Sequence, residues 1–262
     1  MTPGDIVNSL PCFGSDASII DHLPTGAGGS SYLVADGGDA YVLRVDNDLP
    51  RQLMLDRVAE SVILAGVALH ELGPVPVYVD YERAIRVTRY IEGHTWSARE
   101  FLEIHKLAQL GNLLSRVHAI RLDAPSFNLT GRIERYVSLI NTPAARDFAR
   151  QIQEVIATVQ TPLNDRCLCH NDLVGSNIID NGLGLKLIDW EFAAIGDPNF
   201  DLAIVAEHHD LEEREVMALL AAYGVDNAGQ YLEVLEPYRR AYPLLVELWD
   251  MTVDACAKTA AQ

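Results

Sequence analysis

Long hydrophobic runs, cysteines and basic residues are all scarce in this sequence. The longest apolar run, residues 62–69, falls far short of the roughly 20 residues that a membrane-spanning helix needs. The first residues, MTPGDIVNSLP, lack the basic segment and the following apolar segment of a secretory signal. We therefore expect a cytoplasmic protein that has no membrane partner.

The 4 cysteines are Cys12, Cys167, Cys169 and Cys256, which are too few and too unevenly spaced for a disulfide framework. The Cys-x-Cys pair also lacks the spacing of a zinc knuckle. We expect these residues to be buried free thiols.

Lysine and arginine total 20 against 37 aspartates and glutamates, so the formal net charge is −17. Such a charge repels the phosphates of nucleic acids and raises the local concentration of cations. We therefore expect no nucleic-acid partner. The hydrophobic content of 49% is that of an ordinary globular protein with a substantial core.

Strand signals dominate the first part of the chain. A glycine-rich turn over 23–31 precedes expected strands at 32–35 and 40–45, and two further strands are expected at 75–79 and 84–90. Residues 56–69 predict an amphipathic helix between these pairs of strands. We assign its buried apolar stripe to Val58, Val62, Ala65 and Leu69.

Helical signals follow a boundary near residues 90–95, which predicts one lobe over 1–92 and a second over 93–262. Ser97 and Glu100 form a capping box that is expected to begin a helix ending near Ile120. The expected buried face of that helix is Leu107, Leu110, Leu114 and Val117.

The last third of the chain contains a hairpin signal and further helices. Asn181-Gly182 between two apolar runs predicts a hairpin. From about Leu211 the pattern is helical, with Gly224 as a helix stop and with Pro237 and Pro243 as expected interruptions.

Oxygen-bearing side chains gather around this hairpin. Asp172 follows an expected buried strand, Asn177 opens the hairpin and Asp189 closes it, so folding should bring the three to one end. Hard oxygen ligands suit Mg²⁺, which proteins usually hold with one or two side chains plus the phosphates of a substrate. The pattern therefore indicates a phosphate-bearing cosubstrate.

Three segments carry a resemblance to a known family: HNDLVGSN (170–177), IDWE (188–191) and DPNFDLA (197–203). In order and spacing they resemble the kinase-like phosphotransferases of small molecules, the superfamily that includes choline and ethanolamine kinases, aminoglycoside phosphotransferases and thiamine kinases. The resemblance implies an α+β, two-lobed, protein-kinase-like fold. Its N-terminal lobe would be small, rich in strands and nucleotide-binding, and its C-terminal lobe would be mainly helical, catalytic and acceptor-binding.

The resemblance also implies roles for individual residues. Asp172 would accept or orient the proton of the substrate hydroxyl, and His170 would brace its loop. Asn177 and Asp189 would bind Mg²⁺, with Glu191 as a further ligand. Asp201 is expected to support the catalytic loop.

In the first lobe, Arg44 stands where many kinases have a phosphate-contacting lysine, and Glu60 would be its ion-pair partner. Relatives similar to choline kinase also have arginine there, and a guanidinium can bind phosphate oxygens with two hydrogen bonds. The backbone of the glycine-rich turn could approach the phosphates of ATP, and the backbone near residues 89–92 would read the adenine. The expected nucleotide-binding residues besides Arg44 and Glu60 are Gly26, Gly28, Gly29, Ser30, Arg89, Tyr90 and Ile91.

The acceptor is the open part of this interpretation. No Ser or Thr lies between Asp189 and Asp201, which disfavours a phosphorylated activation segment and favours a small acceptor. Tyr231, Tyr238, Tyr242 and Trp249 would line up on an uninterrupted helix, and such rings attract a quaternary ammonium, although a core role is the more common one for such a row. The candidate acceptor-binding residues are Glu207, Tyr242 and Trp249.

We therefore expect ATP- and Mg²⁺-dependent transfer of the γ-phosphoryl group to a hydroxyl of a small cationic metabolite, choline or a related amino alcohol. An aminoglycoside or thiamine phosphotransferase is the alternative within this enzyme class. A nucleotide-binding pseudokinase and a metallohydrolase are alternatives of other kinds.

Overall fold

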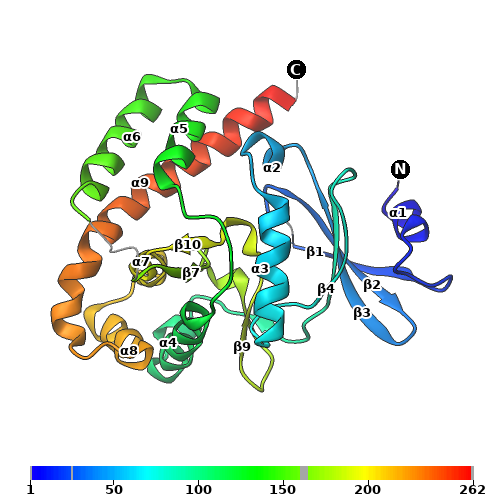
Figure 1. The fold of residues 1–262 in the computed structure, drawn as a ribbon, viewed down its shortest axis with the longest axis horizontal. Helices are drawn as coiled ribbons and strands as arrows, with labels where there is room; N and C mark the ends of the chain where they lie inside the picture. The colour runs from blue at the N-terminus through cyan, green and yellow to red at the C-terminus, as the bar shows by residue number, and fades with distance from the viewer. Residues whose placement is uncertain (1, 25, 160–164, 261–262) are drawn as a thin grey trace. The chain divides into compact units, whose positions relative to one another are not determined.

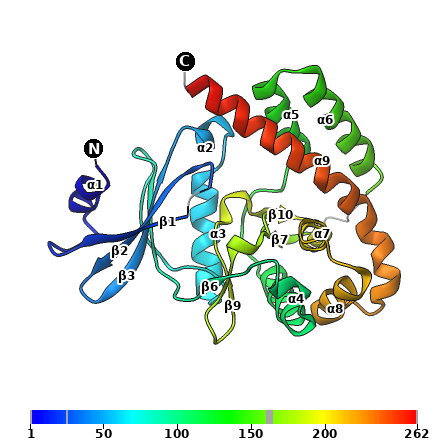
Figure 2. The same ribbon diagram turned by 180° about the vertical axis from the view of Figure 1, so that it is seen from behind.

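The computed structural model describes residues 2–24, 26–159 and 165–260, and backbone contacts divide the chain into two compact units. Unit 1 is Met1–Glu92 and unit 2 is Gly93–Gln262. In Figures 1 and 2, unit 1 runs from blue to cyan and unit 2 from green to red. Among the helices described, none is long and apolar enough to cross a membrane.

Unit 1 is built on an antiparallel sheet in the order β1-β2-β3-β5-β4. The strand β2 pairs along its whole length with β3, from Gly29 opposite Asp46 to Asp36 opposite Asp39, which places a tight turn at Gly37 and Gly38. Both glycines have positive φ, a conformation that glycine adopts without strain. The elements of unit 1 are α1 (Pro3–Ser9), β1 (Ser18–Leu23), β2 (Gly29–Asp36), β3 (Asp39–Asp46), α2 (Leu49–Gln52), α3 (Arg57–Leu69), β4 (Pro76–Asp80) and β5 (Ile85–Arg89).

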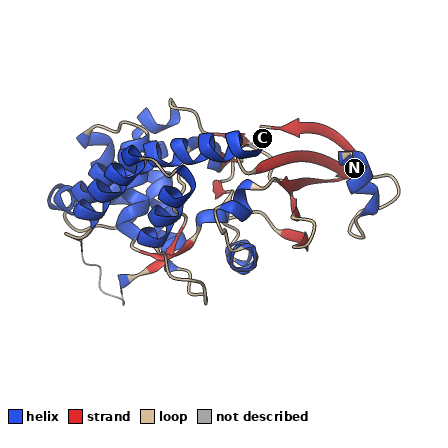
Figure 3. Ribbon diagram, turned by 90° about the horizontal axis from the view of Figure 1, so that it is seen from above, coloured by secondary structure: helices blue, strands red, loops and turns tan. Residues whose placement is uncertain are grey.

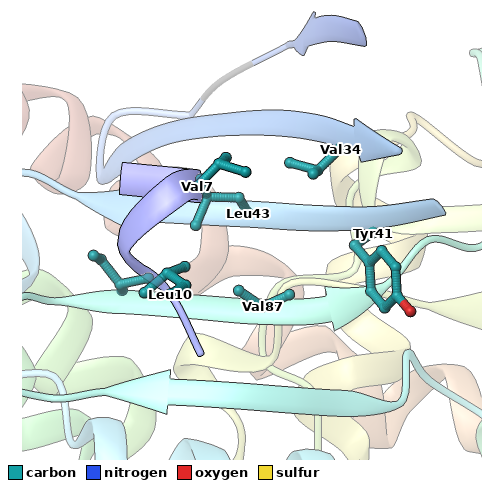
Figure 4. Close-up of a cluster of buried hydrophobic side chains, with 7 residues drawn as sticks. Val7, Leu10, Val34, Tyr41, Leu43 and Val87 are labelled. Atoms are coloured by element: carbon teal, nitrogen blue, oxygen red, sulfur yellow. The ribbon is translucent and has the colours of Figure 1, made fainter. Parts of the chain in front are cut away.

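One face of this sheet forms a hydrophobic core beneath α1. Val7 and Leu10, from α1 and the residue that follows it, lie over strand residues that include Leu43 and Val87 (Figure 4). Leu43 stands opposite Val87 in the register of β3 and β5, so alternate residues of the strands supply this face. The helix α1 and the strand β1 are elements that we did not expect from the sequence.

The helix α3 begins where expected but buries a different face. Asp56 caps it, because its carboxylate accepts the backbone N–H groups of Val58 and Ala59. The stripe assigned from the sequence is exposed: Val58 is 58% exposed and Leu69 is 86% exposed. The buried residues of α3 are Glu60, Ile63, Leu64 and Val67. The assignment was wrong because the helix is apolar on most sides, so apolar spacing alone cannot identify the packed face.

Unit 2 is mainly helical, as the colouring of Figure 3 shows. Its long C-terminal helix α9 packs against α5, α6 and α7, and α4 packs against α8 (Figure 1). The predicted face of α4 is confirmed, since Leu107, Leu110, Leu114 and Val117 are fully buried. The helices of unit 2 are α4 (Ile104–Ala119), α5 (Leu129–Ile140), α6 (Pro143–Ile156), α7 (Pro198–His208), α8 (Glu213–Tyr223) and α9 (Ala228–Ala260).

Short strands and single helical turns in unit 2 carry the predicted motifs. The strand β7 pairs with β10, and β8 lies between β6 and β9 in a second small sheet. The predicted hairpin is confirmed as β8 and β9. These elements are β6 (His94–Thr95), η1 (Glu100–Leu102), β7 (Cys167–Cys169), η3 (Gly175–Asn177), β8 (Ile178–Asp180), β9 (Leu185–Leu187), η4 (Trp190–Phe192) and β10 (Ala194–Gly196).

Two helix boundaries in unit 2 differ from expectation. Ser97 does donate hydrogen bonds to Glu100, but Glu100 begins only the 3₁₀ turn η1, which has no side-chain cap, and α4 begins at Ile104. Pro237 and Pro243 do not end α9, which continues over 33 residues. Each proline removes one backbone hydrogen bond, a cost that the packing of α9 against α5, α6, α7 and α8 offsets. Gly224 does end α8, in the left-handed conformation.

Candidate active site

The loop that follows β7 is held in place by a buried carboxylate. Asp201, in the first turn of α7, has no exposed surface. Its two oxygens accept the backbone N–H groups of His170 and Asn171, each at 2.7 Å. Asn171 has a φ of 63°, a conformation that is rare outside glycine. These bonds hold the sharp turn that leads into Asp172, so the expected supporting role of Asp201 is confirmed.

His118 is a supporting residue that the sequence reasoning did not single out. Its Nε2 lies 3.1 Å from Asp201 Oδ2 and its Nδ1 lies 2.9 Å from the hydroxyl of Tyr223. Because a carboxylate accepts, Nε2 donates to Asp201 and Nδ1 accepts from Tyr223. The last turn of α4 thereby connects to α7 and α8 through this histidine. Only the fold reveals this, since 83 residues separate His118 from Asp201.

His170 is fully buried behind the loop. Its Nε2 donates to the backbone carbonyl of Ile188 at 2.9 Å, and its ring lies against Trp190. Burial lowers the pKa of the imidazole, which favours the neutral form. His170 thus links the loop after β7 to the segment after β9.

The hairpin brings Asn177 and Asp189 to the same end. Asn177 directly precedes β8, and its backbone carbonyl oxygen accepts the backbone N–H of Ile188 at 3.0 Å. Its side-chain Nδ2 donates to the backbone oxygen and to Oδ2 of Asp172, at 2.9 and 2.8 Å. Asp189 follows with a φ of 61°. Asn177 therefore orients the Asp172 carboxylate directly and leaves its own side-chain oxygen for another partner.

Asp172 lies in an environment that disfavours its charge. Burial, then the carboxylates of Asp189 and Glu191, raise its pKa to about 7, while Asn177 and Arg132 act in the opposite direction. Three neighbouring carboxylates with one amide oxygen are a donor set of hard oxygens. A divalent cation such as Mg²⁺ would relieve their mutual repulsion, so these residues fit the expected ion.

Aromatic side chains adjoin these carboxylates. The ring of Phe192 lies 5.7 Å from that of Trp249, edge to face, and the ring of Tyr136 lies 5.8 Å from that of Trp249. The guanidinium of Arg132 lies over Phe192, 4.7 Å from the ring centre. Burial, with smaller effects of Asp172 and Glu191, raises the pKa of Tyr136 to about 12. Arg132 and Tyr136 were missed from the sequence, because α5 carries no recognisable motif, and Phe192 was missed although it directly follows the segment 188–191.

The three candidate acceptor residues occupy different surroundings. Trp249 joins the aromatic group just described. The hydroxyl of Tyr242 bonds to Nδ1 of His208 at 2.9 Å, and burial together with the charge of Asp172 raises the pKa of Tyr242. Glu207 forms an ion pair with Arg239 at 3.0 Å.

The other aromatic residues of that row pack against α7. The hydroxyl of Tyr238 donates to Asp197, the cap of α7, and the hydroxyl of Tyr231 donates to Asn199. Both residues hold α9 on α7, which is the core role that we considered for the row.

A linked group of charged side chains lies on unit 1. Arg44 Nε donates to Asp46 at 2.9 Å, and Arg57 forms ion pairs with both Asp46 and Glu60, each with an N–O distance of 2.7 Å. Arg86, opposite Arg44 in the register of β3 and β5, also pairs with Glu60. Glu60 is 3% exposed, so this carboxylate is buried with its cations. The network joins Arg44 to Glu60 through Asp46 and Arg57.

The other expected nucleotide residues of unit 1 lie in or beside the ends of β2 and β5. Gly26 and Gly28 belong to the segment before β2, whereas Gly29 and Ser30 are its first two residues. A Cβ on Gly29 would lie 2.4 Å from the carbonyl oxygen of Val45, so the two strands approach closely there.

At the far end of β5, Arg89 pairs with Asp39 at 2.8 Å and lies over the ring of Tyr41. The backbone N–H of Tyr90 donates to Ala40, and Ile91 follows in the segment that ends unit 1.

Another group of potential metal ligands lies behind the loop. One ligand atom each from His118, Cys167 and Cys169 lie within 4.8 Å of one another. Both ring nitrogens of His118 are already in hydrogen bonds, so neither is available to an ion. The cysteines are free, and Cys167, Cys169 and Cys256 are buried, as expected, while Cys12 is half-buried.

Known proteins resemble this chain in sequence and in fold. Protein LicA of Haemophilus influenzae is 28% identical over 194 residues, which cover 71% of this chain and 72% of LicA. A second LicA of Haemophilus influenzae matches at 28% identity, and there the chain spans 57% of the relative's length.

Solved structures show that the fold is shared. The choline kinase LicA of Streptococcus pneumoniae superposes with a TM-score of 0.74 at 23% identity, over 90% of this chain and 86% of that one. A LicA in complex with AMP gives a TM-score of 0.78 at 22% identity, over 96% and 88% of the two chains. The expected two-lobed, kinase-like α+β fold is thereby confirmed.

The model of one protein family, described as the phosphotransferase enzyme family, matches residues 20–238. This match covers most of the chain, including the three segments that carried the resemblance. It confirms, at the level of the family, the expectation of an ATP-dependent small-molecule kinase. The chain belongs to the phosphotransferase enzyme family.

Proposed function

We propose that this enzyme transfers the γ-phosphoryl group of ATP to a hydroxyl of a small cationic metabolite, choline or a related amino alcohol. The observation that carries the proposal is the Asp172 carboxylate. Asn177 orients it, and its surroundings raise its pKa to about 7. A carboxylate with such a pKa is suited to accept a proton near neutral pH.

The transfer forms one bond and breaks one bond. The acceptor oxygen bonds to the γ-phosphorus, the bond from that phosphorus to the β–γ bridging oxygen breaks, and ADP leaves with the electron pair. The hydroxyl proton passes to Asp172. Phosphoryl transfer needs no protein nucleophile, because positioning and neutralisation of charge supply most of the catalysis.

Asn177, Asp189 and Glu191 would hold Mg²⁺. When bound, the ion neutralises charge on the phosphates of the nucleotide. The side-chain oxygen of Asn177 is suited to this role, since its Nδ2 is already engaged with Asp172. The fully buried His170 would brace the loop that carries Asp172.

Unit 1 would bind the nucleotide. Arg44 would contact phosphate oxygens, and the buried Glu60 would hold the surrounding cations in place. The backbone at Gly26, Gly28, Gly29 and Ser30 would approach the phosphates. The backbone of Arg89, Tyr90 and Ile91 would contact the adenine.

The cationic acceptor is supported by similarity and by composition. The solved LicA structure is described as a choline kinase, and the acidic net charge attracts cations. We place Trp249, Tyr242 and Glu207 in acceptor binding. Trp249 supplies an aromatic face beside the carboxylate cluster, to which a quaternary ammonium is attracted by about 0.5–2 kcal/mol.

A panel of acceptors tests the proposal. Choline, ethanolamine, thiamine and two aminoglycosides are incubated with ATP and Mg²⁺, and release of ADP is measured. We expect choline or an amino alcohol to give the highest kcat/KM. A preference for thiamine or an aminoglycoside would reassign the acceptor, and the absence of ADP release with every acceptor would contradict the proposed activity. Activity that depends on zinc rather than magnesium would indicate a metallohydrolase.

A further inference from the structure

The side chain of Arg132 lies between two aromatic rings in unit 2. Its guanidinium carbon is 4.8 Å from the ring centre of Phe127 and 4.7 Å from that of Phe192. Phe127 is held by a backbone hydrogen bond to Ile195 and by ring packing on Phe200. Phe192 packs on Trp249. Rings from two separate segments therefore fix the position of this cation.

The side-chain donors of Arg132 have no partner among the residues that the structure describes. No hydrogen bond or ion pair joins its side chain to any residue in the ranges 2–24, 26–159 and 165–260. Ring faces stabilise the charge of a guanidinium but accept none of its five N–H groups, which lie in the guanidinium plane. A half-buried arginine held this way has its hydrogen-bonding edge available to a ligand.

The neighbours of Arg132 include the proposed proton acceptor. The carboxylates of Asp172 and Glu191 attract the guanidinium, although burial lowers its pKa overall. In return, Arg132 lowers the pKa of Asp172. The geometry agrees, because the backbone oxygen of Phe192, whose ring lies under the guanidinium, accepts the side-chain N–H of Asn171 at 2.9 Å, and Asn171 directly precedes Asp172. The cation therefore lies close to the carboxylate beside which the new bond to phosphorus would form.

We propose that the guanidinium of Arg132 binds an oxyanion beside Asp172 during the reaction. The role of this oxyanion site in the reaction rests on the proposed function. The planar edge of an arginine matches two oxygens of a phosphoryl or carboxylate group, and such charge-assisted pairs are stronger than neutral ones. The oxyanion has two sources: the phosphoryl group on its way to the acceptor, or a carboxylate of the acceptor itself.

Binding of inorganic phosphate tests the site without requiring activity. Phosphate is titrated into the full chain by calorimetry, with wild type, Arg132→Gln and Arg132→Lys compared. Arg135→Gln is the matched control, because it removes one positive charge from the same helix. We expect Arg132→Gln to weaken phosphate binding about tenfold or more. Arg132→Lys, which retains the charge without the planar edge, should lie between wild type and Arg132→Gln.

Kinetics with matched acceptors distinguish the two sources. If the oxyanion is the transferred phosphoryl group, Arg132→Gln lowers kcat with every acceptor and leaves the acceptor KM nearly unchanged. If it is an acceptor carboxylate, wild type prefers hydroxy amino acids over the amino alcohols that lack the carboxylate, and Arg132→Gln loses this preference through KM. Either result supports an oxyanion site at Arg132.

The inference is overturned if wild type does not bind phosphate, or if Arg132→Gln binds it as tightly as wild type does. It is also overturned if Arg132→Gln loses no more affinity than Arg135→Gln. Thermal unfolding monitored by circular dichroism shows whether each variant is folded. If Arg132→Gln is not folded, Arg132→Lys replaces it in the comparison with wild type. If phosphate binding depends on Arg132 but the protein phosphorylates none of the acceptors, the proposed function is rejected and the oxyanion site at Arg132 is retained.

Discussion

Two aspartates of unit 2 have opposite surroundings. Asp201 is fully buried and accepts two backbone N–H groups and the Nε2–H of His118. Asp172 has one side-chain donor in Asn177 and two carboxylates nearby. The first aspartate is therefore satisfied within the protein and holds the loop, whereas the second is the residue that we propose to accept the substrate proton.

Replacement of Asp172 by asparagine should abolish proton acceptance while keeping the size of the side chain. We expect kcat to fall about 100-fold or more. Affinity for ATP, measured by calorimetry with the nonhydrolysable analogue AMP-PNP, should remain close to that of wild type. Near-normal turnover in this variant would show that Asp172 does not have the assigned role.

Replacement of Asp201 by asparagine should disturb both folding and the loop. An asparagine presents an NH₂ group to at least one backbone N–H that Asp201 now binds, which leaves a buried donor without a partner. We expect a loss of about 2–4 kcal/mol in the free energy of unfolding, measured by urea titration. The exposed Asp226→Asn is the control and should change stability little. Equal stabilities of the two variants would contradict the supporting role.

Helices α3 and α9 show why single elements are hard to place from a pattern. The helix α3 has apolar residues on most of its circumference, so the spacing that predicts a helix leaves its packed face open. The buried Glu60 lies on that packed face because Arg57 and Arg86 neutralise it there. In α9, packing against α5, α6, α7 and α8 outweighs the local cost of Pro237 and Pro243.

Gly26, before β2, and Gly29, the first residue of β2, form a matched pair of positions for a test of strand packing. A methyl group on Gly29 would meet Val45 O at 2.4 Å, whereas one on Gly26 would meet no atom within 4 Å. We expect Gly29→Ala to cost about 1–3 kcal/mol in unfolding free energy, because β2 and β3 must separate. Gly26→Ala should leave stability nearly unchanged. Chemical unfolding of both variants measures this, and equal losses would contradict the close approach.

At the scale of the whole molecule, the net charge of −17 would act on both proposed substrates. A cationic acceptor is attracted and MgATP²⁻ is repelled, and salt screens both effects within a Debye length of about 8 Å at physiological ionic strength. Raising the salt concentration should therefore raise the KM of the acceptor and lower the KM of the nucleotide. Steady-state kinetics across a range of NaCl concentrations measure both values. A shift of the two KM values in the same direction would show that the net charge does not steer the substrates.

The sequence by itself predicted the hairpin, and the resemblance that its motifs carry predicted the fold class and the candidate carboxylates of the site. Segments 170–177, 188–191 and 197–203 carry that resemblance, and the hairpin follows from the local turn signal at Asn181-Gly182. Only the tertiary structure decided which distant residues join them. His118 reaches Asp201, and Arg132 comes close to Asp172, through the packing of helices, which depends on the shapes of many side chains at once. The spacing of residues along the chain does not predict such long-range contacts.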